Sequence, residues 1–285
     1  MAELIWLASY PKSGNTWFRS FLSNLISEKE EPVNINAMLT DGIASSRDLF
    51  DDWTGIEASD LTFDEIDLIR PDIYMRLIDD SDRNLYMKIH DAYTCLPDGR
   101  PLFPRYKAKA IYLIRNPLDV AVSFSYHSAT TIDKTIASMG NDEFAFCSGN
   151  NRLHNQLRQK LLSWSNHVRS WVDNEIMPVQ VIRYEDMRNQ PWETFKRAVD
   201  FIGLDYNDDK IMQAIQFSDF KVLKQQEEKD AFRERPPRAE SFFRQAKTGD
   251  WVNHLSDEQV KRIIADHKEI MQRFGYLNEK GEVLS

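Results

Sequence analysis

Cysteine is scarce in this chain, and no cysteine motif is present. The 285 residues include two cysteines, Cys95 and Cys147, with neither CxxC nor CxxH spacing. Two cysteines cannot build the disulfide framework that holds small secreted domains together, and their spacing does not match a structural zinc site. We therefore expect neither a disulfide framework nor a metal site.

Long apolar runs and an excess of positive charge are also absent. No stretch of about 18 apolar residues occurs, so we expect no membrane span. Lys and Arg number 36 against 45 Asp and Glu, a net charge of −9. Such a chain lacks the positive field that general binding to nucleic acid or anionic membranes needs, and we expect neither partner. The N-terminal MAELIWLASYPK lacks the features of a signal peptide, so we expect the protein in the reducing cytoplasm.

The remaining composition is typical of a globular α/β protein. Hydrophobic residues make up 42% of the chain and aromatic residues 12%, and the length suits one large domain. Near-continuous apolar runs predict strands buried on both faces of a parallel sheet, at 4–9, 85–89, 110–114 and 179–183. Helical spacing of apolar residues predicts helices between and after them, at 16–27, 118–125, 151–174, 192–202 and 257–274.

This alternation predicts a central parallel sheet flanked by helices in one domain over residues 1–285. Ligands of such sheets bind at the carboxyl ends of the strands. Three segments appear irregular, 28–62, 126–150 and 224–250. Long loops in a compact domain are often functional, so we expect the first to contact a substrate and the third to cover a cofactor.

The segment YPKSGNTW, residues 10–17, directly follows the first predicted strand. A strand, a tight turn with Gly14 and a helix start together aim backbone N–H groups at an anion. Lys12 adds a cation, and neighbouring polar side chains add donors. The alternative is a plain strand-to-helix turn, which leaves Lys12 and Trp17 unexplained. The order of Lys12 and Gly14 is the reverse of the ATP-binding loop GxxxxGK[ST], which weakens an ATP–Mg²⁺ interpretation.

Two further strand ends carry polar side chains. Arg115 ends one strand, and Ser123 lies two turns into the helix that Pro117 should begin. Both could bind one phosphate, although singly an ion pair and a packing role explain them as well. At the end of another strand, the period of two places Lys88 and His90 on the same face. A lysine and a histidine there are poorly explained as core residues.

Together these segments resemble a known family, the PAPS-dependent sulfotransferases (PAPS is 3′-phosphoadenosine 5′-phosphosulfate). SYPKSGNTW is similar to the family's YPKSGTTW loop, and RNPLDVAVS, residues 115–123, resembles RNPxDxxVS. FFRQAKTGDW, residues 242–251, resembles FxRKGxxGDW, with Gln245 and Ala246 in place of Lys-Gly. KIH, residues 88–90, is similar to the family's KTH.

The resemblance implies a P-loop-like α/β fold and a PAPS-binding strand–loop–helix. It implies that the 5′-phosphosulfate is bound by Lys12, Ser13, Gly14, Asn15, Thr16 and Trp17. It implies that the 3′-phosphate is bound by Arg115, Ser123 and Arg244. On the adenine side it points to Trp17, Tyr184, Ser218 and Phe220, with a core role left open for Trp17 and Tyr184.

The resemblance also implies a mechanism without a metal. His90 would be the general base that takes the proton of the acceptor hydroxyl. Lys12 would stabilise the leaving oxygen, and Lys88 the sulfonate oxygens. His127 is the first substitute if His90 is structural.

Two other functions remain open, an ATP-dependent P-loop kinase and a PAP-binding protein without activity (PAP is the desulfated nucleotide). Aromatic residues in the irregular segments favour an alcohol or phenol as the small-molecule acceptor, or they simply pack. The family's dimer motif after GDW is not matched, because Val252, Ser256, Asp257 and Lys261 fill its places. The oligomeric state therefore stays open.

Overall fold

The computed structural model describes residues 2–149, 152–236, 241–243 and 247–284, and these form two compact units. The first unit extends to Tyr10 and then includes Thr40–Tyr112 and Asp142–Val181. The second consists of Pro11–Leu39, Leu113–Asn141 and the chain from Ile182 onward. Each unit has a hydrophobic cluster of its own. A single domain over residues 1–285 stays a prediction.

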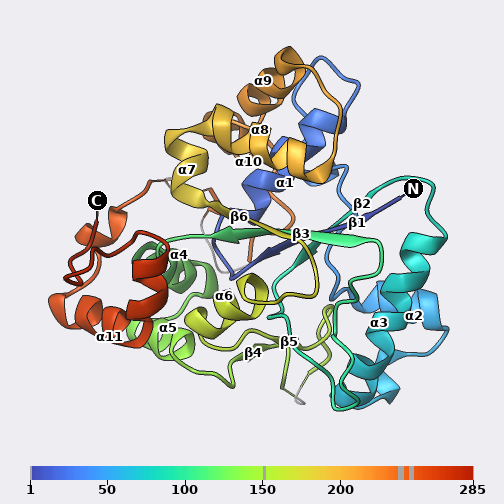
Figure 1. Ribbon diagram of the computed structural model, residues 1–285, viewed down its shortest axis with the longest axis horizontal. Coiled ribbons are helices and arrows are strands. Elements are labelled where there is room, and N and C mark those ends of the chain that lie inside the picture. The colour runs from blue at the N-terminus through green and yellow to red at the C-terminus, as the bar shows by residue number, and fades with distance from the viewer. Residues whose placement is uncertain (1, 150–151, 237–240, 244–246, 285) are drawn as a thin grey trace. The chain divides into compact units, whose positions relative to one another are not determined.

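The main sheet gives the first unit its framework (Figure 1). Among the described residues it has four parallel strands, in the order β2 (Leu85–Ile89), β1 (Leu4–Ser9), β3 (Ala108–Ile114) and β6 (Val179–Arg183). In the β1–β2 pair, Leu4 lies beside Leu85 and Ala8 beside Ile89. Residues 4–8 are fully buried, as expected for a strand covered on both faces. The apolar runs thus predicted the strands, and only β3 begins two residues earlier than expected.

Helices and a short hairpin complete the first unit. They are α2 (Arg47–Thr54), the 3₁₀ turn η2 (Ala58–Asp60), α3 (Phe63–Asp79), α6 (Trp164–Val172), and the strands β4 (Ala145–Phe146) and β5 (Gln159–Lys160). A capping box formed by Thr62 and Glu65 starts α3. The ring of Trp6 on β1 packs edge-on against Tyr74 of α3, with 5.1 Å between the centroids. This contact fixes α3 to the sheet.

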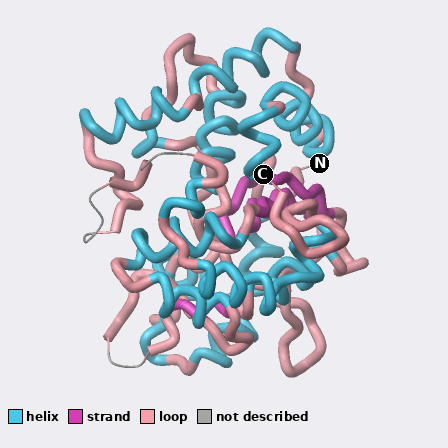
Figure 2. The backbone as a smooth tube through the Cα atoms, turned by 90° about the vertical axis from the view of Figure 1, so that its left-hand side faces the viewer, coloured by secondary structure: helices cyan, strands magenta, loops and turns pink. Residues whose placement is uncertain are grey.

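The described part of the second unit is helical apart from the last residues of β3 and β6 and the connecting loops (Figure 2). Its elements are α1 (Asn15–Ile26), η1 (Ile35–Ala37), α4 (Pro117–Ser128), α5 (Ile132–Met139), α7 (Tyr184–Asn189), α8 (Pro191–Ile202), α9 (Asp208–Phe217), α10 (Phe220–Lys229), η3 (Asp250–Asn253) and α11 (Asp257–Arg273). Helix α1 packs on α9, and α4 packs on α5 and α11.

The helix predicted over 151–174 was wrong at its N-terminal part. Helix α6 begins at Trp164, where the Ser163 side chain caps it. The preceding residues form a loop and the strand β5, and Leu162 has a left-handed φ of 60°. Leu157 and Leu161 are buried at helical spacing, but their backbone is extended or turned.

Several helices were not predicted. Helices α3 and α9 have no counterpart in the predicted pattern, and Pro71 lies inside α3, where proline argues against a helix. The segments expected to be irregular hold α2, α5 and most of α10. No helix in the described ranges has both the length and the apolar character to span a membrane.

Candidate functional site

The loop between β1 and α1 is a tight turn that favours glycine at position 14. Its backbone is left-handed at Lys12, with φ of 70°, and at Gly14, with φ of 100°. A Cβ atom on Gly14 would lie 2.8 Å from the ring of Tyr184 and 2.9 Å from Met187 Cε. Ordinary carbon contacts are about 3.5–4.0 Å. The loop therefore lies directly against Tyr184, and a side chain at position 14 would force Tyr184 or Met187 to move.

Donors gather on this loop. Helix α1 begins at Asn15 with no acidic residue in its first turn, and the first N–H groups of a helix have no intrahelical acceptor. The Ser13 hydroxyl is buried and has no hydrogen-bond partner among the described residues. Asn15 and Thr16 are also buried. A buried donor without a partner and an open helix N-terminus suit a bound anion.

Arg115 lies beside the same loop. Its Nη1 donates to the carbonyl oxygen of Lys12 at 3.2 Å, and its Nη2 to that of Lys247 at 3.0 Å. The guanidinium carbon lies 4.3 Å from the centre of the Tyr184 ring. No carboxylate among the described residues pairs with Arg115. The structure thus brings Lys12, Gly14, Arg115 and Tyr184 together.

Asp119 holds the turn before η3. Its carboxylate accepts hydrogen bonds from the backbone N–H of Gly249 at 2.8 Å and of Trp251 at 3.1 Å. Asp119 also lies in the first turn of α4, where an acidic residue suits the helix N-terminus. In the sequence, only its place in the RNPxD segment, residues 115–119, could have indicated that Asp119 has a role beyond the helix start. Asp119 therefore ties the GDW turn to the N-terminus of α4.

The aromatic residues predicted on the adenine side are packed together. Trp17 meets Tyr184 edge-on, with 5.7 Å between the ring centroids. Tyr184 is buried, and burial raises the pKa of its hydroxyl. Phe220 packs against the cluster of Ile35, Leu223, Phe232 and Phe243. The roles of these residues toward adenine stay predictions.

Two other predicted residues, Ser123 and Ser218, make none of the contacts given above. Ser123 is half-buried on α4. Ser218 is buried, and its hydroxyl donates to the carbonyl oxygens of Ala214 and Ile215 at the end of α9. Arg244 lies outside the described residues, together with Gln245 and Ala246.

Glu227 fixes the segment that precedes Arg244. The Glu227 carboxylate accepts hydrogen bonds from the Ser241 hydroxyl and from the backbone N–H groups of Phe242 and Phe243, at 2.6–2.9 Å. The ring of Phe242 in turn lies 4.1 Å from the Lys12 ammonium. Glu227 was not anticipated from the sequence, since nothing in the charged run around it singled it out.

Lys88 and His90 belong to the first unit. Lys88 is hydrogen-bonded through its backbone to Gly42 and Ala44, which run parallel to the end of β2. Met87 and Ile89 are buried while Lys88 and His90 are partly exposed, as the period of two predicts. The Nδ1 of His90 lies 2.8 Å from the carbonyl oxygen of Ser9. A carbonyl only accepts, so Nδ1 carries the proton and Nε2 is the basic nitrogen.

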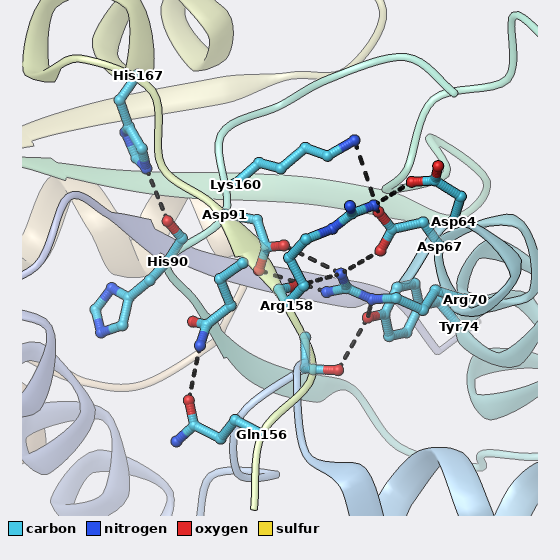
Figure 3. A network of polar contacts seen from close by, with 12 residues as sticks. Asp64, Asp67, Arg70, Tyr74, His90, Asp91, Gln156, Arg158, Lys160 and His167 are labelled. Atoms are coloured by element: carbon cyan, nitrogen blue, oxygen red, sulfur yellow. Dashed lines mark hydrogen bonds and ion pairs between the residues drawn. The ribbon is translucent and has the colours of Figure 1, made fainter. Parts of the chain in front are cut away.

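A second histidine, His167, contacts the backbone of His90 (Figure 3). His167 Nε2 lies 3.0 Å from the carbonyl oxygen of His90, and its Nδ1 lies 2.8 Å from the Tyr112 hydroxyl. Complete burial lowers the pKa of His167 to about 4, so the ring is neutral near pH 7. Its Nε2–H donates to His90, and its Nδ1 accepts from Tyr112. The pattern of the sequence around His167 gives no sign of this role.

An ion-pair cluster anchors the residue after His90. The guanidinium of Arg70 lies 3.1 Å from Asp91 and 3.3 Å from Asp67, and all three residues are buried. Arg158 reaches Asp67 at 2.5 Å. The backbone carbonyl of Asp91 accepts a hydrogen bond from Trp171 at 2.9 Å. Figure 3 shows that the His90 ring points away from this cluster. The turn at His90 and Asp91 is therefore held rigidly.

The fold and the loop are those of an α/β protein that binds a phosphate-bearing ligand. Residues 3–275 match the model of the sulfotransferase domain family, and the chain belongs to that family. Within the ranges that the structure describes, no group of three or more His, Cys, Asp or Glu side chains could hold a metal ion.

Curated relatives are sulfotransferases of plants and mammals. Flavonol 3-sulfotransferase of Flaveria bidentis is 29% identical over 277 residues, which is 91% of this chain and 78% of the relative. Sulfotransferase 2A6 of Rattus norvegicus is 31% identical over 173 residues, 59% of this chain and 58% of the relative. With the second relative the match therefore covers less than two thirds of either protein.

Solved structures share the fold. Mouse sulfotransferase SULT7A1 complexed with PAP aligns with 98% of this chain and 86% of its own, with a TM-score of 0.62 and 22% identity. Retinol dehydratase in complex with androsterone and PAP aligns with 94% of this chain and 80% of its own, with a TM-score of 0.60 and 17% identity.

Proposed function

We propose that this protein transfers the sulfuryl group of PAPS to a hydroxyl of a small acceptor molecule. The observation that carries the proposal is the loop at Ser13 and Gly14. It combines a buried hydroxyl that lacks a partner among the described residues, a glycine at which a Cβ atom would clash with Tyr184 and Met187, and the open N-terminus of α1. Membership of the sulfotransferase family supports the same chemistry.

On the nucleotide side, the residues present suit a ligand with two phosphate groups. The 5′ end would be held by Lys12 and by the loop as far as Trp17, and the 3′-phosphate by Arg115, with Ser123 and Arg244. Arg115 Nε is buried and has no hydrogen-bond partner in the described chain, so the guanidinium keeps a donor for an anion. Lys12 would then stabilise negative charge on the leaving oxygen.

On the acceptor side, His90 would take the proton of the attacking hydroxyl. Its Nδ1 is committed to the Ser9 carbonyl, so Nε2 is the nitrogen that can accept this proton. Lys88, two residues earlier on β2, would stabilise the sulfonate oxygens. PAPS supplies the sulfuryl group, and PAP leaves.

The acceptor would be an alcohol or a phenol. The relatives include a flavonol sulfotransferase, and a retinol dehydratase shares the fold, so hydroxyl compounds are a reasonable class for this chain. We propose the cytoplasm as the place of the reaction, in keeping with the sequence. The negative net charge argues against nucleic acid as a partner.

Ligand-induced stabilisation tests this proposal directly. PAP should raise the melting temperature much more than AMP, because AMP lacks the 3′-phosphate. At a hundredfold excess over the dissociation constant, PAP should add about 2.7 kcal/mol. Equal shifts from AMP and PAP would contradict the roles of Arg115 and Ser123. A larger shift from ATP–Mg²⁺ than from PAP would favour the kinase alternative.

The role of His90 needs a kinetic test. His90→Ala should leave PAP affinity nearly intact and lower turnover by roughly 10²–10⁴, the usual contribution of a positioned base. A phenol acidic enough to ionise unaided should recover part of the loss. If the variant keeps its turnover, His90 is structural, and His127 becomes the candidate base.

Lys12→Ala serves as the companion variant, because Lys12 is proposed to act on charge that appears during the reaction. It should lower turnover more than PAP affinity. A loss confined to PAP affinity would show that Lys12 only binds the nucleotide.

A further inference from the structure

Two arginines of the first unit lack an acidic partner. Arg47 is the first residue of α2, and Arg152 precedes the loop to β5. Among the described residues no carboxylate lies within ion-pair distance of either one, although carboxylates outnumber Lys and Arg by 45 to 36. The Nη1 of Arg47 is buried and has no hydrogen-bond partner in the described chain. A buried guanidinium nitrogen without an acceptor is costly.

Both guanidinium groups converge on one residue, His154. Arg47 Nε donates to the backbone carbonyl of His154 at 2.8 Å, and Arg152 Nε lies 3.5 Å from the His154 ring. Burial and then the charges of Arg152 and Arg47 lower the pKa of His154. Like charges brought to one point repel each other. An anion bound there would relieve the repulsion and supply the missing acceptor.

This arginine pair lies near the end of β2 that carries His90. Ala44 donates a hydrogen bond to Lys88, and the chain at Ile43 runs parallel to β2. Arg47 follows Ala44 by three residues, so it lies within about 10 Å of that contact, at about 3.3 Å per residue. Burial raises the pKa of the Cys147 thiol, on which the charges of Arg152, Arg47 and Asp91 also act. Asp91 is the neighbour of His90.

We propose that Arg47 and Arg152 bind an anionic group of the acceptor, so that the preferred substrate is a hydroxyl compound that also carries a carboxylate. The inference rests on the proposed function and specifies its substrate class. The planar fork of arginine matches the two oxygens of a carboxylate. The acceptor's hydroxyl would lie at His90 and its carboxylate at the arginine pair.

Matched acid and ester acceptors test the inference. The probes are 4-hydroxyphenylacetate and its methyl ester, and 6-hydroxyhexanoate and its methyl ester, assayed for PAP release. Within each pair the hydroxyl is the same, and only the charge differs. Wild-type protein should show a kcat/KM for at least one acid that exceeds that for its ester by about 10- to 100-fold, the range of a charge-assisted hydrogen bond.

Arg47→Gln and Arg152→Gln should each reduce this preference mainly through KM, while the rate with the ester stays the same. Arg47→Lys should restore part of it, because the charge remains and the fork is lost. Arg262→Gln is the control, since it removes the same charge from an arginine of α11 that has Asp266 as a partner.

The outcomes separate the inference from the proposed function. If acids and esters react equally, or if both Gln variants keep the wild-type preference, the arginine pair is not an acceptor site and sulfuryl transfer still stands. If PAP stabilises the protein but only esters react, the inference fails alone. If PAP gives no stabilisation and no acceptor releases PAP, the proposed function fails and the inference with it.

Discussion

Charged groups are arranged in opposite ways in two regions of this protein. Behind His90 in the first unit, Asp67, Arg70 and Asp91 are buried and satisfied by one another. At the loop between β1 and α1 in the second unit, the neighbouring Arg115 donates only to backbone carbonyls among the described acceptors, and Ser13 has no described partner. A buried charge must be paired somewhere. Where the protein itself provides the partner the cluster is structural, and where it does not a ligand is expected.

Individual arginines also differ in whether the protein provides a charged partner for them. Arg70 has two carboxylates and a tyrosine hydroxyl within hydrogen-bond distance. Among the described residues, Arg47 and Arg115 have hydrogen-bond acceptors only in the backbone. Residue type is therefore a poor guide to function here, and the identity of the partner is a better one.

Removal of Arg70 should give the largest effect on stability. Arg70→Met leaves Asp91 buried without its cation, and breaking a buried pair in this way destabilises by about 3–5 kcal/mol. Urea unfolding of the variant and the wild type measures the difference. Lys196→Met is the matched control, because Lys196 pairs with Asp200 on the surface of α8; its midpoint should not change measurably. A small effect at Arg70 would mean that the cluster is not the structural element described above.

The next largest effect should be a pH dependence of the free energy of unfolding, which arises from His167. Burial lowers the pKa of this histidine to about 4 in the folded protein, from an ordinary value of 6.5. Between these values the unfolded chain holds a proton that the folded chain does not, so stability falls as pH falls from 6.5 to 4. The loss should approach about 3 kcal/mol at the acid end. His167→Gln should lack this contribution.

Urea midpoints at intervals from pH 7.5 to 4.5 would measure this dependence in both proteins. Carboxylates titrate in both, so the difference between the two curves isolates His167. Parallel curves would show that His167 titrates normally and is not locked as the neutral donor to His90.

Gly14→Ala should have an intermediate effect on the free energy of unfolding. Its new contacts lie at the loop between β1 and α1, in the second of the two regions compared. The new Cβ would meet Tyr184 and Met187 at less than 3 Å, and overpacking of this kind costs about 1–3 kcal/mol. Gly203→Ala controls for backbone strain, because Gly203 has a φ of 81° but nothing within 4 Å of an added Cβ. PAP affinity should fall in the first variant only. Equal effects in both would reduce the role of Gly14 to its φ angle.

The smallest effect concerns the left-handed backbone at Lys12. The left-handed conformation costs a residue with a side chain roughly 1 kcal/mol, whereas glycine adopts it without this cost. Lys12→Gly should therefore be about 1 kcal/mol more stable than Lys12→Ala in thermal or urea unfolding, while both lose turnover. Equal stability of the two variants would show that the loop holds no such strain.

The sequence predicted those features that depend on local pattern. Near-continuous apolar runs located the strands of the main sheet, and Pro117 marked the start of α4, where the Asn116 side chain caps the helix. The glycine at position 14 was expected in the loop because a tight turn there needs it. These features require only neighbours along the chain.

Features that depend on distant partners were not predictable. Nothing near His167 indicates that it lies against Tyr112 and His90, which are 55 and 77 residues away. Glu227 sits in a charged run typical of solvent-exposed helices, yet it is buried and binds three donors. Such roles arise from tertiary packing, and a period of apolar residues carries no information about them.

The two units alternate along the chain, which passes from one to the other after Tyr10, Leu39, Tyr112, Asn141 and Val181. Synthesis on the ribosome therefore delivers them in a fixed order. The first unit has all its segments once Val181 has emerged, whereas the second still needs the chain up to its C-terminal helix. Domains fold as they are completed during synthesis. The unit with His90 can consequently mature while the unit with Arg115 still waits for α11, so nascent chains whose exposed part ends just after Val181 should resist proteolysis mainly within the first unit.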